Sequence, residues 1–133
     1  MNLSKLRALI IEDSILKAND IRKALIYNGI TNTLHVSNQA DAWTEIYKSV
    51  NNEAALDLIV TDMHYPLEAG AFADEEAGFK LIERMKQEGI DIPVIICSTR
   101  NYNMPGILGS VWYSKLRDIE EDFEAVLNRL YRK

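Results

Sequence analysis

The sequence predicts an α/β fold: a doubly wound parallel sheet with helices on both faces. Three short apolar runs, residues 8–11, 56–60 and 93–97, are nearly continuous rather than alternating in polarity. Such runs are typical of parallel strands that are covered on both faces. The segments between the runs have helical periodicity, and a strand–helix alternation of this kind implies right-handed crossovers within one sheet.

In the first half of the chain, residues 8–11 form the first expected strand and residues 14–28 the first helix. Gly29 follows that helix, as is common just past a helix end. The run at residues 33–36 is more polar, so we expect a strand nearer the sheet edge. A second helix is expected at residues 40–50, because its apolar residues recur at three- and four-residue steps: Trp43, Ile46, Tyr47 and Val50.

In the second half, residues 56–60 and 93–97 are expected strands, and the weaker run at 107–113 is the fifth. The third helix is expected at residues 77–88, followed by Gly89. The last helix is predicted by apolar residues at helical spacing: Ile119, Phe123, Val126, Leu127 and Leu130. The chain therefore predicts five strands joined by helices.

From length and composition we expect one ordinary domain spanning residues 1–133, with no output domain attached. The formal charge is −5 and the basic residues are scattered, so direct nucleic-acid binding is not expected. Cys97 is the only cysteine and lies in an apolar run, which indicates a buried thiol in a reducing compartment. The first apolar run is too short to span a membrane. We expect a cytoplasmic protein without a membrane partner.

Carboxylate, hydroxyl and ammonium side chains follow four of the predicted strands. They are Glu12 and Asp13, then Asp62, then Ser98 and Thr99, and finally Ser114 and Lys115. In open parallel sheets, ligands bind at the carboxyl ends of the strands. Converging carboxylates repel one another unless they share a cation, and Mg²⁺ suits a site with few carboxylates and open positions. A carboxylate there can attack phosphorus, with Lys115 and Ser98 supplying charge and a hydroxyl.

This ordered set of residues resembles the receiver domains of two-component response regulators, and the similarity spans essentially the whole chain. The resemblance implies a flavodoxin-like receiver topology, with five parallel strands in the order 2-1-3-4-5. It also implies a phosphoacceptor switch of a phosphorelay, in which a partner histidine kinase or phosphotransfer protein phosphorylates an aspartate in the presence of Mg²⁺. Output would run through protein contacts.

The same resemblance assigns the metal and acceptor roles. Asp62 would be the phosphoacceptor. Asp13 and Asp62 would bind Mg²⁺ directly, together with the backbone carbonyl of His64, and Glu12 would act largely through water.

It also assigns the residues around the phosphoryl group. Ser98 would hydrogen-bond that group and Lys115 would pair with it. Trp112, three residues before the lysine, matches the aromatic position that changes rotamer in the family. Thr99 stands where a smaller residue is usual and would narrow access to the phosphoryl group.

The chain departs from the family pattern in two segments. The stretch at residues 63–76 is enlarged by roughly eight residues and carries several acids, which would shield the acceptor or select its kinase. Between Ser98 and Lys115 only sixteen residues intervene, and prolines and glycines interrupt any helical pattern. The fourth helix of the family is therefore expected to be short or absent.

Two other functions are compatible with the same residues. A degenerate receiver would keep the fold and bind partners without phosphorylation. An aspartate-nucleophile phosphatase would place an acid two residues after the nucleophile, where this chain has His64. The main expectation is a switch that at most phosphorylates and dephosphorylates itself, rather than a turnover enzyme.

Overall fold

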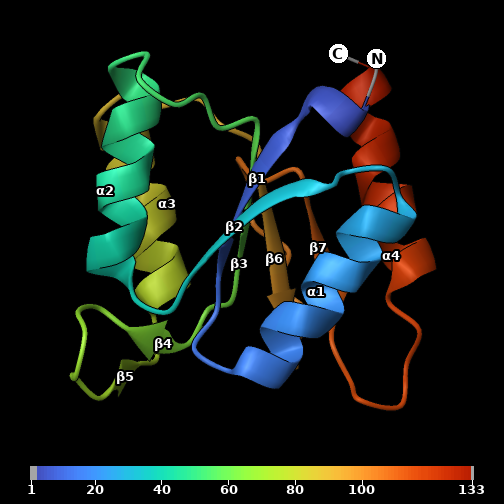
Figure 1. Ribbon diagram of the computed structural model, residues 1–133. Helices are drawn as coiled ribbons and strands as arrows, with labels where there is room; N and C mark the ends of the chain where they lie inside the picture. The colour runs from blue at the N-terminus through green and yellow to red at the C-terminus, as the bar shows by residue number, and fades with distance from the viewer. Residues whose placement is uncertain (1–2, 133) are drawn as a thin grey trace.

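A five-stranded parallel sheet forms the centre of the molecule (Figure 1). The computed structural model describes the backbone of residues 3–132 and the side chains of residues 3–130. The strands of the sheet are β1 (Arg7–Ile11), β2 (Asn32–Val36), β3 (Leu58–Thr61), β6 (Val94–Ser98) and β7 (Gly109–Trp112).

The strand order is β2-β1-β3-β6-β7, and every neighbouring pair is parallel. Because β6 and β7 are the fourth and fifth strands of this sheet along the chain, this is the expected order 2-1-3-4-5. Strands β3 and β6 are buried along their whole length, whereas β2 is partly exposed at the sheet edge. The doubly wound parallel sheet is confirmed.

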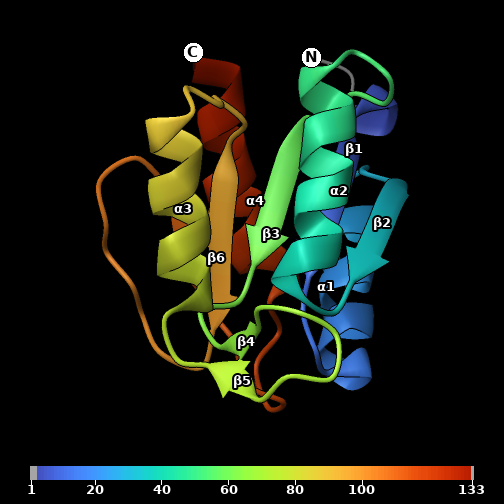
Figure 2. The same ribbon diagram turned by 90° about the vertical axis from the view of Figure 1, so that its left-hand side faces the viewer.

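The helices cover both faces of the sheet, with α1 and α4 on one side and α2 and α3 on the other (Figures 1 and 2). Their bounds are α1 (Ile15–Tyr27), α2 (Gln39–Val50), α3 (Ala77–Gln87) and α4 (Glu120–Leu127). The side chains of Ser14 and Asn38 cap α1 and α2 by accepting backbone N–H groups of the first turn. Short 3₁₀ helices precede β1 at Leu3–Lys5 and follow α4 at Asn128–Arg132. Within the described chain, none of the helices has the length and apolar character needed to cross a bilayer.

Two hydrophobic cores result, one on each face of the sheet. Successive strand residues point to opposite faces, so Ile10 packs in the core beneath α1 and α4, while Leu9 and Ile11 pack beneath α2 and α3. Phe123 of α4 is fully buried in the first core, and Leu81 of α3 in the second. This double coverage explains why the central strands read as continuous apolar runs.

The enlarged stretch after β3 contains a small hairpin that the sequence did not indicate. Its strands are β4 (Tyr65–Pro66) and β5 (Ala73–Asp74), and they pair antiparallel. Figure 2 shows the hairpin beyond the carboxyl ends of β3 and β6. The Lys80 ammonium of α3 lies 2.6 Å from the Asp74 carboxylate, and the backbone N–H of Ala40 donates to Leu67 O at 2.9 Å. The hairpin is thus tied to α3 and α2.

No helix forms between β6 and β7, in agreement with the expected loss of the family's fourth helix. Residues 99–108 run as an irregular connection along the outside of α3, as Figure 2 shows. Because this connection contains Pro105 and Gly106, with Gly106 in the left-handed region at φ 86°, a continuous helix is not available to it.

Candidate functional site

Three carboxylates meet at the carboxyl ends of β1 and β3. These strands are neighbours in register, with Ile11 opposite Thr61, so the residues that follow them lie side by side. The backbone N–H of Asp62 donates to Ile11 O at 3.2 Å, which continues the pairing one step past the strand. One carboxylate oxygen each of Glu12, Asp13 and Asp62 lies within 4.8 Å of the other two. The sequence prediction that these acids converge is therefore met by the geometry.

Glu12 is the buried member of this group, with a relative exposure of 1%. One carboxylate oxygen, Oε2, accepts the backbone N–H of Ser14 at 3.0 Å. The other, Oε1, lies 2.8 Å from the Lys17 Nζ. Among the described residues, this ion pair is the polar contact that Oε1 makes, and the oxygen is otherwise buried. Burial raises the pKa of Glu12 to about 7, against the opposing attraction of Lys17.

Lys17, in the first turn of α1, supplies the positive charge of the site. Its ammonium lies 2.8 Å from Glu12 and 3.1 Å from Asp62 Oδ2, and its side chain is only 8% exposed. Burial lowers the pKa of Lys17, but the nearby charges of Glu12 and Asp62 outweigh burial and raise it above its ordinary value. The lysine is held in its charged form between two carboxylates.

The Asp62 side chain is held by a hydrogen bond from the neighbouring backbone and is partly exposed to the cavity. Its Oδ1 accepts the backbone N–H of Met63 at 2.7 Å, and its side chain is 14% exposed. The first turn of α3 packs against it closely, because a Cβ added at Gly78 would lie 2.5 Å from Asp62 O. Glycine is the residue that permits this approach of the helix to the strand end.

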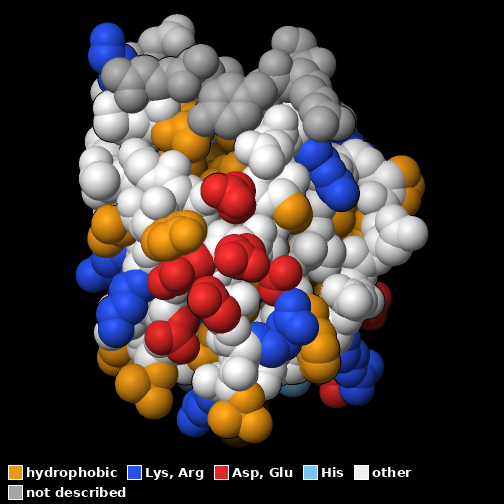
Figure 3. All heavy atoms as spheres, turned by 90° about the vertical axis from the view of Figure 1, so that its right-hand side faces the viewer, with side chains coloured by type: hydrophobic (Ala, Val, Ile, Leu, Met, Phe, Trp, Pro, Cys, Tyr) orange, Lys and Arg blue, Asp and Glu red, His pale blue; other side chains and the backbone are white. Residues whose placement is uncertain are grey.

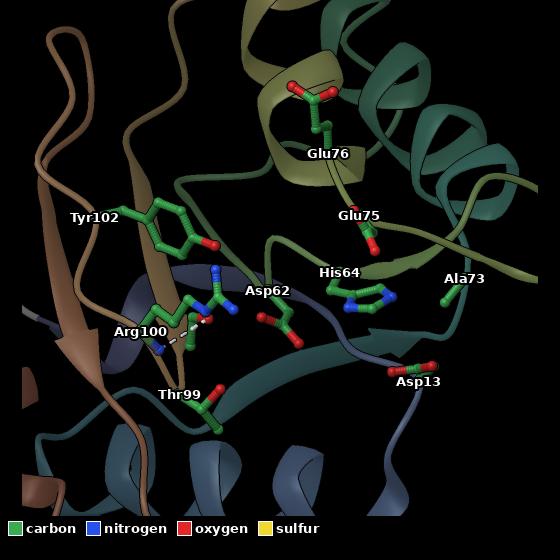
Figure 4. Close-up of a pocket in the computed structure, with 10 residues that line it drawn as sticks. Asp13, Asp62, His64, Ala73, Glu75, Glu76, Thr99, Arg100 and Tyr102 are labelled. Carbon is green, nitrogen blue, oxygen red and sulfur yellow. Dashed lines mark hydrogen bonds between the residues drawn. The ribbon is translucent and has the colours of Figure 1, made fainter.

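Asp62 and Asp13 border a cavity of about 710 Å³ between the hairpin and the β6–β7 connection (Figure 4). In Figure 4, His64 and Glu75 lie on the hairpin side, and Arg100 lies on the opposite side with its guanidinium directed into the cavity. The full lining is Asp13, Asp62, His64, Ala73, Glu75, Glu76, Ser98, Thr99, Arg100 and Tyr102. A group attached to Asp62 would extend into this space.

The predicted hydroxyl and aromatic positions lie near this cavity. Ser98, at the end of β6, is buried and lines it, and its Oγ accepts the Arg100 backbone N–H at 3.4 Å. Thr99 lines the cavity and is exposed. Trp112 is 45% exposed, and its Nε1 donates to Thr99 O at 3.0 Å. The side chain of His64 also lines the cavity. Ser98 and Thr99 are thus brought to Asp62, whereas Trp112 is linked to them through Thr99.

Lys115 is not brought to Asp62. It is exposed and lines a different cavity of about 250 Å³, together with Asp20 and Lys23 of α1. The Tyr113 hydroxyl donates to Asp20 at 2.6 Å, which ties the chain leaving β7 to the side of α1. Figure 3 shows this side of the molecule, on which acidic side chains gather among scattered basic ones. Among the described residues, the ammonium that pairs with Asp62 is that of Lys17.

The residues present fit a hard divalent cation. Three acidic side chains converge on one point, and among the described residues Lys17 is the cation that pairs with two of them. Oε1 of Glu12 is buried and contacts the Lys17 ammonium at 2.8 Å, and a carboxylate oxygen in this position can also bind a cation or its water. Oxygen-only ligands of this number are those that Mg²⁺ takes in proteins. Glu12, Asp13 and Asp62 are therefore the residues that would hold it.

Sequence reasoning missed Lys17, although a signal was present. Lys17 lies on the same stripe of α1 as the buried residues Ala18, Ile21 and Leu25. A lysine on the buried face of a helix is rarely left without a partner, so its position indicated a buried anion nearby. The cavity residues Arg100 and Tyr102 gave no such signal, because the path of an irregular connection cannot be read from periodicity.

Comparisons with known proteins agree on the fold. No family model matches the chain, and no curated protein does. Among solved structures, it is similar to the chemotaxis response regulator CheY4 of Vibrio cholerae, with 19% identity, TM-score 0.61, and coverage of 96% of this chain and 97% of that one. It is also similar to the phosphorylated cyanobacterial phytochrome response regulator RcpA, with 18% identity, TM-score 0.65, and coverage of 92% and 89%.

A third similar structure is RcsB, described as two dimers bound to two parallel DNAs, with 18% identity and TM-score 0.67. The match covers 96% of this chain but only 64% of the RcsB chain. At these identities the comparisons establish architecture. Together with the strand order and the helices on both faces of the sheet, they show that this chain has the fold of a response-regulator receiver domain.

Proposed function

We propose that the chain is a phosphoacceptor signalling switch in which Asp62 accepts a phosphoryl group. The observation that carries this proposal is the position of Asp62 at the carboxyl end of β3. There one of its oxygens lies within 4.8 Å of one oxygen each of Glu12 and Asp13, and the Lys17 ammonium lies 3.1 Å from its Oδ2. A carboxylate so placed faces a cavity large enough for a phosphoryl donor.

The chemistry required of Asp62 is a nucleophilic displacement at phosphorus. One carboxylate oxygen attacks the phosphorus and forms an acyl phosphate, while the bond from phosphorus to the donor breaks and the donor leaves with the bonding electron pair. Ser98 lines the same cavity, and its hydroxyl would donate to the transferred group. Mg²⁺, when bound by the three acids, would supply charge neutralisation for this transfer.

The donor is proposed to be the phosphohistidine of a histidine kinase or of a phosphotransfer protein, with a small acyl phosphate as a chemical substitute. The phosphoryl group would stay on Asp62 and would not be released as a product of turnover. Each chain would therefore accept one phosphoryl group. Output is proposed to run through protein contacts.

Intact-mass analysis after incubation with acetyl phosphate and Mg²⁺ tests the proposal. We expect a single phosphoryl adduct on the wild type and none on Asp62→Asn, with Asp91→Asn as a matched control because Asp91 is an exposed aspartate remote from the carboxylate cluster. An adduct that persists in Asp62→Asn, or no adduct on the wild type, refutes it. Steady phosphate release without adduct would indicate the phosphatase alternative.

One observation favours the second candidate, a receiver fold that binds partners without phosphorylation. The lysine that the family resemblance assigns to the phosphoryl group, Lys115, lies in a separate cavity. If Lys17 serves only as an internal counter-ion, Asp62 is neutralised rather than activated. The binding-module proposal predicts that Asp62→Asn leaves partner capture unchanged, whereas the switch proposal predicts that capture responds to acetyl phosphate only when Asp62 is present.

A further inference from the structure

The position of Lys17 carries an inference that rests on the proposed function and deepens it. We infer that Lys17, from the first turn of α1, supplies the cation that the phosphoryl-transfer site requires, in place of Lys115. The role is catalytic because the ammonium contacts the reacting carboxylate directly: Nζ lies 3.1 Å from Asp62 Oδ2.

The local structure fixes Lys17 in this position. Helix α1 begins immediately after the acidic pair, and the Ser14 side chain accepts the Lys17 backbone N–H at 3.3 Å. The Ser14 backbone N–H in turn donates to Glu12 Oε2 at 3.0 Å. The short connection between β1 and α1 is thereby folded so that the third residue of the helix returns over the strand ends. From this position at the amino end of α1, the Lys17 ammonium reaches the Asp62 carboxylate.

The Lys17 side chain is largely shielded from water, so its ammonium must be compensated by groups of the protein. Lys17 is 8% exposed, and its ammonium lies 5.4 Å from the centre of the Tyr113 ring. A buried ammonium is stable only when anions compensate its desolvation, and here the anions are Glu12 and Asp62.

Lys17 is suited to phosphoryl transfer because its ammonium lies next to the carboxylate that would be phosphorylated. An ammonium in contact with Asp62 Oδ2 lies beside the oxygen atoms at which negative charge is redistributed when a phosphoryl group is added to that carboxylate. Of the other cations, Lys115 lines another cavity, and Arg100 lines the Asp62 cavity but forms no ion pair with Asp62 among the described residues. Lys17 is therefore the cation in place before the donor arrives.

Three substitutions test this inference: Lys17→Met, Lys115→Met and the matched control Lys23→Met, an exposed lysine further along α1. We expect Lys17→Met to slow acyl-phosphate formation from acetyl phosphate by roughly 100-fold to 1000-fold. Lys115→Met and Lys23→Met should stay within about twofold of the wild-type rate, since neither ammonium contacts Asp62.

A second readout separates this role from a merely structural one. Removing an ammonium that contacts two carboxylates should tighten Mg²⁺ binding by roughly tenfold or more, measured by titration calorimetry, because the carboxylates no longer share their charge with Lys17. A variant that had only lost its structure would bind Mg²⁺ more weakly. Tighter Mg²⁺ binding with slower phosphorylation is the expected combination.

A wild-type phosphorylation rate in Lys17→Met overturns the inference while leaving the proposed function intact. Absence of any adduct on the wild type overturns both. If circular dichroism shows that Lys17→Met is unfolded, the Lys115→Met variant provides the test. Phosphorylation of Lys115→Met at the wild-type rate supports Lys17 as the cation. Loss of phosphorylation in Lys115→Met overturns the inference.

Discussion

Replacing Gly78 by alanine would place a methyl group where α3 packs against the acceptor strand. The added Cβ would lie 2.5 Å from the backbone oxygen of Asp62, 3.0 Å from the Met63 Cα and 3.3 Å from the Met63 sulfur. Two of these three neighbours are backbone atoms, which cannot rotate away. The Gly78 N–H also donates to Met63 O at 3.0 Å, so movement of the helix breaks or lengthens that hydrogen bond.

The size of the effect follows from these distances. Ordinary van der Waals contact begins at 3.4 Å, so the helix and the loop must separate by about 0.9 Å, the difference between 3.4 Å and 2.5 Å. Overpacking of this kind costs about 1–3 kcal/mol, and alanine returns up to about 1 kcal/mol through its higher helix propensity. A backbone clash belongs at the upper end of that range, so we expect Gly78→Ala to lower the free energy of unfolding by about 2 kcal/mol.

Urea denaturation measures this change, with Gln87→Ala, an exposed substitution near the end of α3, as the control for helix propensity. Displacement of Asp62 by nearly an ångström should also slow its phosphorylation by about 100-fold. A Gly78→Ala variant as stable as the wild type, and phosphorylated at the same rate, would refute the reasoning that this glycine is required by the contact with Asp62.

Three further substitutions test the site and the cores. Burial raises the pKa of Glu12 from 4.5 to about 7, so between those values Glu12 binds more protons in the folded chain than in the unfolded one. In the Mg²⁺-free protein, the contribution of Glu12 to stability should therefore fall by roughly 3 kcal/mol from pH 4.5 to pH 7. Urea unfolding of Glu12→Gln should lack that loss, and parallel pH profiles for the two proteins would contradict the assignment. Tyr65→Phe removes the buried hydroxyl that accepts from Thr61 at 3.2 Å and should cost about 1 kcal/mol in urea unfolding, so unchanged stability would argue against that hydrogen bond. Phe123→Ala empties a fully buried position beneath α4 and should cost about 3–5 kcal/mol in thermal or urea unfolding; a loss below about 1 kcal/mol would mean that this core collapses around the gap.

Much of the fold could be predicted from the chain because its signals are local. The nearly continuous apolar runs correspond to β1, β3 and β6, with bounds that differ by one or two residues. The periodic segments correspond to the four α-helices. The hairpin β4–β5 escaped prediction because its strands are two residues each, too short for any periodicity, and because hydrogen bonds to α2 and ion pairs to α3 hold it in place.

Part of the candidate site could also be predicted from the sequence. The strand ends alone indicated Glu12, Asp13 and Asp62, because parallel strands present their carboxyl ends at one edge whatever the loops do. Ser98 was found for the same reason.

The source of the positive charge was decided only by the tertiary structure. Lys115 follows β7 by three residues, and its direction depends on the path of the chain after that strand. The Tyr113 hydroxyl donates to Asp20 of α1, and Lys115 lines a cavity beside Asp20 and Lys23 that does not include Asp62. Lys17 reaches Asp62 because α1 packs with its amino end over the strand ends, a relation between helix and sheet that no spacing in the sequence records. The sequence determined the carboxylates, and the packing of α1 determined their cation.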